Sequence, residues 1–189
     1  MPDSLAPEAV APRLRGRFGI DYRYVESTPS TQLLLAADAA EGAVVVAGEQ
    51  TAGRGRLGRS WVAPAGTSLL CSVQLRPAVA PDRLPELTGV IARACAEAIE
   101  TVTGLETELK FPNDVLVGGR KVAGILAEAR DSRVVAGIGV NVNIAEVDLP
   151  TRLETPATSL LVETRRETDR AELLVELLER IERRYDAWL

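Results

Sequence analysis

The sequence predicts an α+β fold, with a mixed, mostly antiparallel sheet and flanking helices. Short segments that alternate in polarity or are rich in β-branched residues join through tight turns, as antiparallel hairpins do. Two longer segments repeat their apolar residues every three or four positions, which is typical of amphipathic helices. Because 46% of the 189 residues are hydrophobic and only 4% are aromatic, we expect one domain with an aliphatic core.

The first half of the chain is expected to supply three strands and one helix. Residues 20–25 alternate between apolar and polar side chains, which predicts a strand. Ser30 is placed to cap a helix over residues 31–40. Residues 43–47 form a nearly nonpolar, β-branched run typical of a buried strand. Residues 68–75 alternate, so we expect a half-buried strand there.

The second half is expected to supply a helix, two hairpins and a final helix. Helical spacing of apolar residues predicts the helices, and Gly-Gly and Asp-Ser pairs predict the hairpin turns. The elements are, in order, a helix over 87–102 ended by Gly104, a strand from Glu108, a hairpin over 115–128 that turns at Gly118-Gly119, a hairpin that turns at Asp131-Ser132 and returns over 134–140, and a helix over 173–185 capped by Asp169.

Composition excludes several classes of function. A formal net charge of -5 argues against general binding to nucleic acid or anionic membranes, and no apolar run reaches the roughly 18 residues of a membrane span. The chain has no histidine, which excludes His-based triads, and two cysteines alone cannot fill a zinc site. Cys71 and Cys95 lie in apolar patterns, so we expect reduced core residues and a cytoplasmic protein.

One loop is a cationic island on this acidic chain. Residues 53–61 read Gly-Arg-Gly-Arg-Leu-Gly-Arg-Ser-Trp and contain Arg54, Arg56 and Arg59. Glycine lets backbone approach a ligand, and arginine presents a planar fork of donors to carboxylates and phosphates. This pattern favours a loop that closes over an anion; a solubilising surface loop and nucleic-acid binding of the RGG kind are the alternatives. Trp61 could stack on a planar base or anchor the loop in the core.

Three further motifs could contribute to chemistry. Lys110, Asn113 and Asp114 would bring a cation, an amide and a carboxylate to one end of the sheet, which suits a phosphate tail with its Mg²⁺; an ordinary turn is the alternative. Lys121 begins an otherwise apolar strand, either as a functional lysine at a cleft edge or as a side chain that reaches solvent. The glycines within residues 137–143 indicate close approach of a ligand or backbone, or a bulge.

Together these motifs resemble the catalytic domain of the biotin–protein ligases over about residues 24–145. The distinctive string is Gly-Arg-Gly-Arg-x-Gly-Arg-x-Trp, followed by Pro-Asn-Asp and Arg-Lys-x-Ala-Gly. The resemblance implies the biotin–lipoate ligase fold, similar to class II aminoacyl-tRNA synthetases. It also implies ATP-dependent ligation of biotin, through biotinyl-5′-AMP, to one lysine of a biotin carboxyl carrier domain such as that of acetyl-CoA carboxylase. The chain departs from the family at Gln32, usually Asn, and at Phe111, usually Trp.

The resemblance assigns roles to particular residues. The candidate catalytic residues are Arg54, Lys121 and Asp114, the last either deprotonating the carrier lysine or holding Lys121. The candidate biotin-binding residues are Ser30, Thr31, Gln50, Arg54, Lys121 and Gly124. The candidate ATP- and adenylate-binding residues are Arg56, Arg59, Trp61, Lys110, Asn113, Lys121 and Asn141. We expect no metal site of the protein's own, only Mg²⁺ carried by ATP near Asn113 and Asp114.

Residues 1–17 are expected to be a flexible tail and residues 18–189 the catalytic domain. The tail is too short for the winged helix of repressor-type relatives, so we expect no DNA partner, and we expect the SH3-like domain that ends many relatives to be lacking. Residues 53–61 are expected to be open without ligand and ordered over the adenylate. The alternative functions are a lipoate–protein ligase or acyltransferase of the same fold, a degenerate fold member that stores adenylate without transferring it, and a non-enzymatic module that binds anions or nucleic acid.

Overall fold

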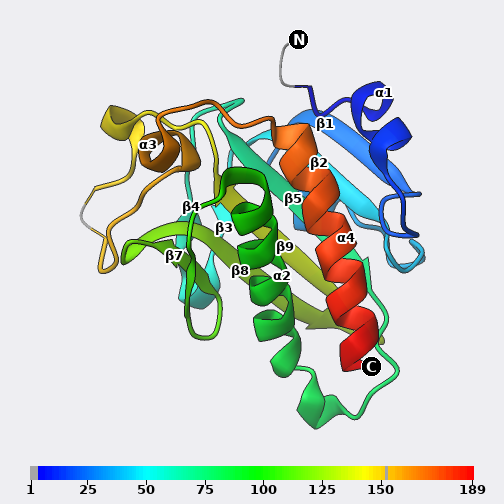
Figure 1. Cartoon of the computed structure of the whole chain (residues 1–189). Coiled ribbons are helices and arrows are strands. Elements are labelled where there is room, and N and C mark those ends of the chain that lie inside the picture. Colours follow the sequence, from blue (N-terminus) through cyan, green and yellow to red (C-terminus); the bar gives the residue numbers. More distant parts are fainter. Residues whose placement is uncertain (1–3, 152) are drawn as a thin grey trace.

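A mixed seven-stranded sheet forms the centre of the molecule in the computed structural model, which describes residues 4–151 and 153–189 (Figure 1). The strand order is β1-β2-β5-β9-β8-β7-β6, and β1 and β2 run parallel whereas the other neighbouring pairs are antiparallel. The predicted fold class is therefore confirmed. The strands of this sheet are β1 (Tyr22–Thr28), β2 (Val44–Gln50), β5 (Ser68–Leu75), β6 (Glu108–Lys110), β7 (Asp114–Val117), β8 (Arg120–Arg130) and β9 (Arg133–Asn141).

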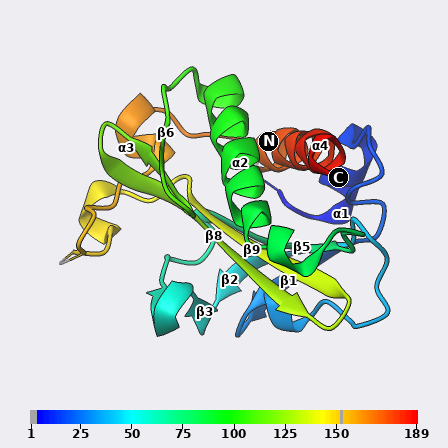
Figure 2. The ribbon, with the colours of Figure 1, turned by 90° about the horizontal axis from the view of Figure 1, so that it is seen from below.

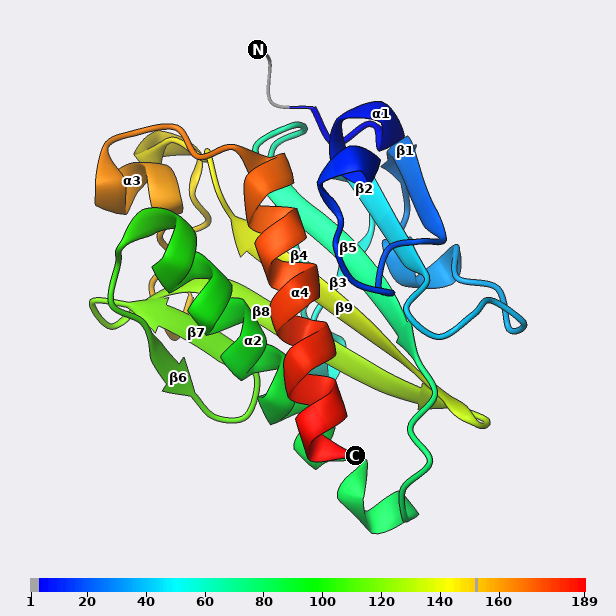
Figure 3. The same ribbon diagram turned by 45° about the vertical axis from the view of Figure 1, so that its right-hand side comes forward.

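Two long helices, α2 (Glu86–Thr103) and α4 (Arg170–Trp188), pack side by side on one face of the sheet (Figures 2 and 3). Gly104 ends α2 with a left-handed φ of 74°, as predicted. Asp169 begins α4 by accepting hydrogen bonds from two backbone N–H groups of its first turn. Two short helices, α1 (Pro7–Val10) and α3 (Leu160–Thr164), lie at the edges.

Strand β5 is buried along its whole length, although its alternating pattern predicts a half-buried strand. Its apolar residues belong to the core under the helices. Its polar residues Ser72 and Gln74 are also fully buried, because the segment after β1 covers the opposite face. Both polar side chains have hydrogen-bond partners there, so their burial leaves no donor or acceptor of these bonds unpaired and costs little free energy.

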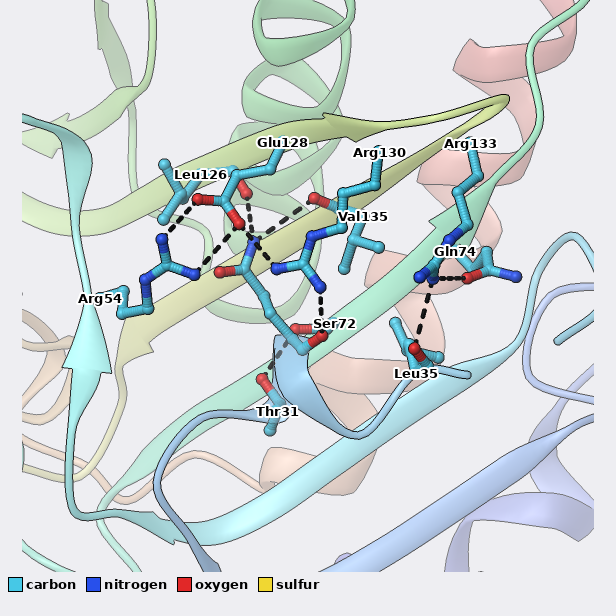
Figure 4. Close-up of polar contacts among 11 residues, drawn as sticks. Thr31, Leu35, Arg54, Ser72, Gln74, Leu126, Glu128, Arg130, Arg133 and Val135 are labelled. Carbon is cyan, nitrogen blue, oxygen red and sulfur yellow. Dashed lines mark hydrogen bonds and ion pairs between the residues drawn. The ribbon is translucent and has the colours of Figure 1, made fainter. Parts of the chain in front are cut away.

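The segment predicted as a helix over residues 31–40 is mostly irregular. Only a single turn, η2 (Thr31–Leu33), forms, and Ser30 makes no side-chain capping bond. Side chains of the sheet bind the backbone carbonyls that a helix would satisfy internally. Arg133 donates to the carbonyl of Leu35 (Figure 4), and it also donates to the carbonyl of Ala36. Arg76 and Gln74 donate to further carbonyls of the segment. Tertiary contacts therefore override the local helix signal.

Residues 4–17 are folded, in contrast to the predicted flexible tail. They form α1 and a further turn, η1 (Ala11–Arg13), and they bury Leu5 and Val10 in the main core. Arg17 pairs with Glu182 and Asp186 of α4. The expectation fails here because two apolar side chains suffice to anchor a short segment that has little periodicity. The first three residues lie outside the described part of the chain.

The two cysteines are free and buried, as predicted. Burial raises the pKa of both thiols, that of Cys95 to about 12, so neither is a reactive thiolate at neutral pH. Among the described residues, no helix is both long and apolar enough to cross a membrane.

Candidate active site

The candidate site lies on the sheet face opposite α2 and α4 (Figure 2). There the arginine/glycine loop (residues 53–61) forms a small hairpin of β3 (Gly53–Arg54) and β4 (Ser60–Trp61). A cavity of about 50 Å³ lies between this loop and the sheet. It is lined by Ser30, Thr31, Gln32, Gln50, Arg54, Gly55, Arg56, Trp61, Cys71, Asn113, Lys121, Gly124, Ile125, Leu126, Gly137, Ile138 and Gly139. All six candidate biotin-binding residues are among them.

The floor of this cavity carries a set of paired polar groups. Thr31 donates from its backbone N–H to Gln50 Oε1 at 2.8 Å, and its hydroxyl lies 2.7 Å from that of Ser72. Ser30 and Thr31 are buried. Buried donors and acceptors are costly unless they are paired, so this arrangement is specific. It offers both donors and acceptors in a pocket that is also lined by the side chains of Arg54, Arg56 and Lys121.

Trp61 anchors the loop on the sheet, which was one of its two predicted roles. A Cβ atom at Gly139 would lie 2.6 Å from the Trp61 ring, and a Cβ atom at Gly124 would lie 2.9 Å from it. The ring therefore packs directly on the backbone of β8 and β9, where only glycine leaves room. Strand pairing is regular at Gly139, which excludes the bulge alternative. The indole N–H of Trp61 is buried and has no hydrogen-bond partner among the described residues.

A chain of polar contacts runs from the loop to β7 and β8. Arg56 donates to Asn113 Oδ1 at 2.9 Å, and Asn113 donates in turn to Asp114 Oδ1 at 2.9 Å. The same carboxylate oxygen lies 2.7 Å from Lys121 Nζ, and this ion pair is largely shielded, with side-chain exposures of 25% and 17%. The Lys121 ammonium also lies 5.6 Å from the centre of the Trp61 ring. This contact is the one that the predicted role of Asp114 in holding Lys121 requires, and its role toward the carrier lysine stays a prediction.

A second cavity, of about 590 Å³, adjoins the first. Arg56, Trp61, Asn113 and Lys121 line both cavities, so these side chains mark their junction. The wall of the larger cavity comprises Gly55, Arg56, Leu57, Arg59, Ser60, Trp61, Val62, Asn113, Asp114, Lys121, Asn141, Pro150, Leu153, Glu154, Thr155 and Ala157. The candidate nucleotide residues are thus brought together, Lys110 excepted.

Lys110 and Asn141 are held by the segment before α3. Lys110 Nζ donates to Thr155 Oγ1 at 2.6 Å, so its ammonium lies one side chain away from the larger cavity. Asn141 is buried and donates to the carbonyl of Thr158 at 2.9 Å. That segment carries no motif, and sequence reasoning did not identify Thr155 or Glu154 as parts of the site.

Glu128 is a further residue that the sequence analysis missed. Its carboxylate receives both Nη groups of Arg54, at 2.8 and 3.2 Å (Figure 4). The alternation of β8 could have identified Glu128, because every second residue of a strand points to the same face. Glu128 therefore shares a face with Gly124 and Leu126, which line the small cavity. The Arg59 side chain, by contrast, contacts Glu154 at 3.5 Å, and both of these side chains are exposed.

Comparison with known proteins agrees with this geometry. The family model described as the biotin/lipoate A/B protein ligase family matches residues 24–144. The bifunctional ligase/repressor BirA of Bacillus subtilis is 42% identical over 151 residues, which cover 77% of this chain and 46% of that protein. The biotin–[acetyl-CoA-carboxylase] ligase of Mycobacterium tuberculosis is 42% identical over 146 residues, covering 72% and 53%. The chain thus spans about half the length of these curated relatives.

Among solved structures, the biotin protein ligase of Aquifex aeolicus in complex with biotin and ATP superposes with a TM-score of 0.80. It is 34% identical, and the match covers 88% of this chain and 71% of that chain. The loop, the Lys121–Asp114 pair and both glycines under Trp61 fall inside the range that the family model matches. From motif, fold and site together, the chain belongs to the biotin/lipoate A/B protein ligase family.

Proposed function

We propose that this chain ligates biotin to one lysine of a biotin carboxyl carrier domain, with ATP converted to AMP and pyrophosphate. One observation carries the proposal: Lys121, Arg54 and Arg56 line a small polar pocket that opens beside a larger cavity. Such a junction suits the meeting of a carboxylate with a nucleotide phosphate. The names of the relatives, and the biotin and ATP in the Aquifex aeolicus complex, support this choice of substrates.

In the first step a biotin carboxylate oxygen attacks the α-phosphorus of ATP. A bond from oxygen to phosphorus forms, the bond to the bridging oxygen breaks, and pyrophosphate leaves with the electron pair. Repulsion between two unit charges about 4 Å apart is roughly 4 kcal/mol at an effective dielectric constant of 20. Lys121 and the arginines of the loop offset this repulsion and stabilise the charge that develops at phosphorus.

In the second step the amine of the carrier lysine attacks the carbonyl carbon of the mixed anhydride. The amide bond forms, the bond to the phosphate oxygen breaks, and AMP leaves. The amine loses a proton in this step, and we assign its acceptance to Asp114, a carboxylate that lines the larger cavity. Its contact with Lys121 would have to loosen first, because the ammonium lies against Oδ1.

We assign the polar pocket to the biotin ring and the larger cavity to the nucleotide. Ser30, Thr31 and Gln50 present the hydrogen-bonding groups that a ureido ring requires. A cavity of about 50 Å³ holds only one or two waters, so the ring enters when a wall moves. The wall that moves is the arginine/glycine loop with Trp61. The other walls come mainly from strands of the central sheet and from the turn at Thr31–Leu33, which is hydrogen-bonded to those strands.

Mg²⁺ would accompany ATP and neutralise its phosphates. The described residues contain no cluster of three or more His, Cys, Asp or Glu side chains that could hold a metal ion. Asn113 and Asp114 supply one amide and one carboxylate beside the larger cavity. This sparse donor set fits Mg²⁺, which keeps several substrate phosphate oxygens and waters. Lys110 and Arg59 would face the same phosphates.

Substrate-dependent release of pyrophosphate tests the proposal. We expect release with biotin and Mg-ATP, and none with lipoate in place of biotin. Release with lipoate alone would favour the lipoate-ligase alternative, and no release with either would refute ligase activity. We further propose a cytoplasmic location, which the two free cysteines support, and no DNA partner; a band shift of DNA at about 150 mM salt would contradict the latter.

A further inference from the structure

Glu128 joins the arginine/glycine loop to the sheet. Its two carboxylate oxygens receive both Nη groups of Arg54, and Oε2 also receives Nη2 of Arg130 at 2.8 Å (Figure 4). One carboxylate is therefore shared by two guanidinium groups from different segments. Arginine has five N–H donors, so Arg54 keeps donors for a substrate while it holds Glu128.

Arg130 extends this contact to Gln32, which also lines the small cavity. Its Nη1 donates to the backbone carbonyl of Gln32 at 3.2 Å. The Gln32 side chain donates in turn to the carbonyl of Leu126 at 2.9 Å, on the strand that carries Glu128. Arg54 and Gln32, which both line the small cavity, are thus connected through two charged side chains of β8.

The Arg54–Glu128 contact is the strongest attachment among those of the three loop arginines. It is bidentate, and its side chains are 46% and 26% exposed, for Arg54 and Glu128 respectively. The Arg59–Glu154 pair spans 3.5 Å and is about 70% exposed on both sides, so water screens it. Arg56 contacts an uncharged amide. Charge-assisted, bidentate contacts are about twice as strong as neutral ones.

We propose that Glu128 and Arg130 are positioning residues that keep the arginine/glycine loop closed over the site. They act through Arg54 and Gln32 and do not themselves touch the substrate. This inference rests on the proposed function for its effect on catalysis, since a reactive adenylate needs a closed site that excludes water. The position of the loop itself is independent of that function.

The test compares Glu128→Gln with a matched control, Glu97→Gln. Glu97 is also shared by two arginines, Arg180 and Arg184, and is also about one-quarter exposed, but it lies on α2, on the far face of the sheet. In the free protein, we expect Glu128→Gln to accelerate trypsin cleavage after Arg54 and Arg56 about three- to tenfold. Glu97→Gln should leave cleavage in the loop at the wild-type rate even if it lowers Tm as much.

A second readout follows the adenylate. Protein loaded with biotin and α-³²P-labelled ATP is separated from free nucleotide, and the bound label is followed with time. We expect Glu128→Gln to lose label about three- to tenfold faster than wild type, with a smaller change in its rate of adenylate formation at saturating substrates. Glu128→Asp, which keeps the charge, should recover part of the retention, and Arg130→Met should change both rates in the same direction as Glu128→Gln.

The two arms separate failure of this inference from failure of the proposed function. Wild-type protein that binds no label would refute adenylate formation, while the cleavage assay would still report on Glu128. Wild-type rates of cleavage and label loss in Glu128→Gln would overturn the role of Glu128. Wild-type rates in Arg130→Met would overturn that of Arg130.

Discussion

Substitution of Gly139 by alanine tests whether Trp61 sets the position of the loop. The new Cβ atom would lie 2.6 Å from Trp61 Cε2 and 2.8 Å from Cζ2. Ordinary contacts between such atoms begin near 3.4 Å. The backbone of β9 is fixed by neighbouring strands on both sides, so the indole must move by about 1 Å. Because Trp61 lies at the junction of both cavities, the loop must move with it.

The expected effect is large on activity and small on folding. Overpacking in a rigid core costs about 1–3 kcal/mol, but Trp61 lies on a small hairpin that can be displaced. Displacement of catalytic groups by about 1 Å can lower a rate by about 100-fold. We therefore expect kcat/KM for biotin-dependent pyrophosphate release to fall between about 10- and 100-fold, with Tm reduced by a few degrees.

A matched alanine substitution provides the control. Gly89 lies in α2, and a Cβ atom there would be 3.3 Å from the exposed ring of Phe111, which can move aside. Helix propensity favours alanine over glycine by about 1 kcal/mol, so Gly89→Ala should keep full activity and a similar or higher Tm. Acrylamide quenching of Trp61, measured in a Trp188→Phe background, should increase in Gly139→Ala. Unchanged quenching and unchanged kcat/KM in Gly139→Ala would refute the reasoning.

Three further predictions concern single groups. Lys121→Ala should lower the rate of adenylation by about 100-fold or more and weaken biotin binding much less, because the ammonium acts mainly on the charge at phosphorus. Single-turnover kinetics measures the rate and calorimetry measures the affinity for biotin. Equal losses of rate and of affinity would show that Lys121 only binds biotin. Thr31→Val removes the hydroxyl next to Gln50 and should weaken biotin binding by roughly 1–3 kcal/mol, with unchanged ATP binding, as measured by calorimetry. An unaltered affinity for biotin would contradict the assignment of the small cavity to biotin. The hydrogen bond from Arg184 lowers the pKa of Glu97, so this pair stabilises the folded protein above about pH 4.3, and that stability is lost as the pH falls through the lower folded-state pKa. The decrease of Tm with falling pH should therefore be shallower in Glu97→Gln than in the wild type. An identical dependence of Tm on pH in the two proteins would argue against this contribution.

The regular elements were predictable because their residues repeat with the period of the structure. Strand β5 begins and ends where the alternation over residues 68–75 does, and Gly104 ends α2 as expected. The Gly118-Gly119 and Asp131-Ser132 turns join the predicted hairpins. In each case local propensity and tertiary packing favour the same conformation.

The failures occur where partners distant in sequence decide the structure. Residues 31–40 carry a helix signal, but guanidinium groups from Arg76 and Arg133 bind their carbonyls and hold an irregular turn. The burial of Leu5 depends on a core whose other members, apart from Val10 and Phe18, lie at Val44 or beyond. Neither arrangement leaves a periodic pattern nearby, so neither is visible in a window of sequence.

The candidate site was predictable as far as the motifs reach. The motif residues lie around two adjoining cavities, and Asp114 contacts Lys121. Their roles toward biotin and ATP stay predictions. Glu128 and Thr155 could not be assigned in advance, because single carboxylates and hydroxyls are common and only the folded sheet brings them to Arg54 and Lys110.

Mass spectrometry of a biotin carboxyl carrier domain tests the central claim most directly. The carrier is incubated with this chain, biotin and Mg-ATP, in parallel with Lys121→Ala. The convergence of cations at the junction of the two cavities predicts a mass gain of one biotinyl group on a single carrier lysine, largely lost in the variant. An unmodified carrier with the wild-type chain, or equal modification by Lys121→Ala, would contradict it.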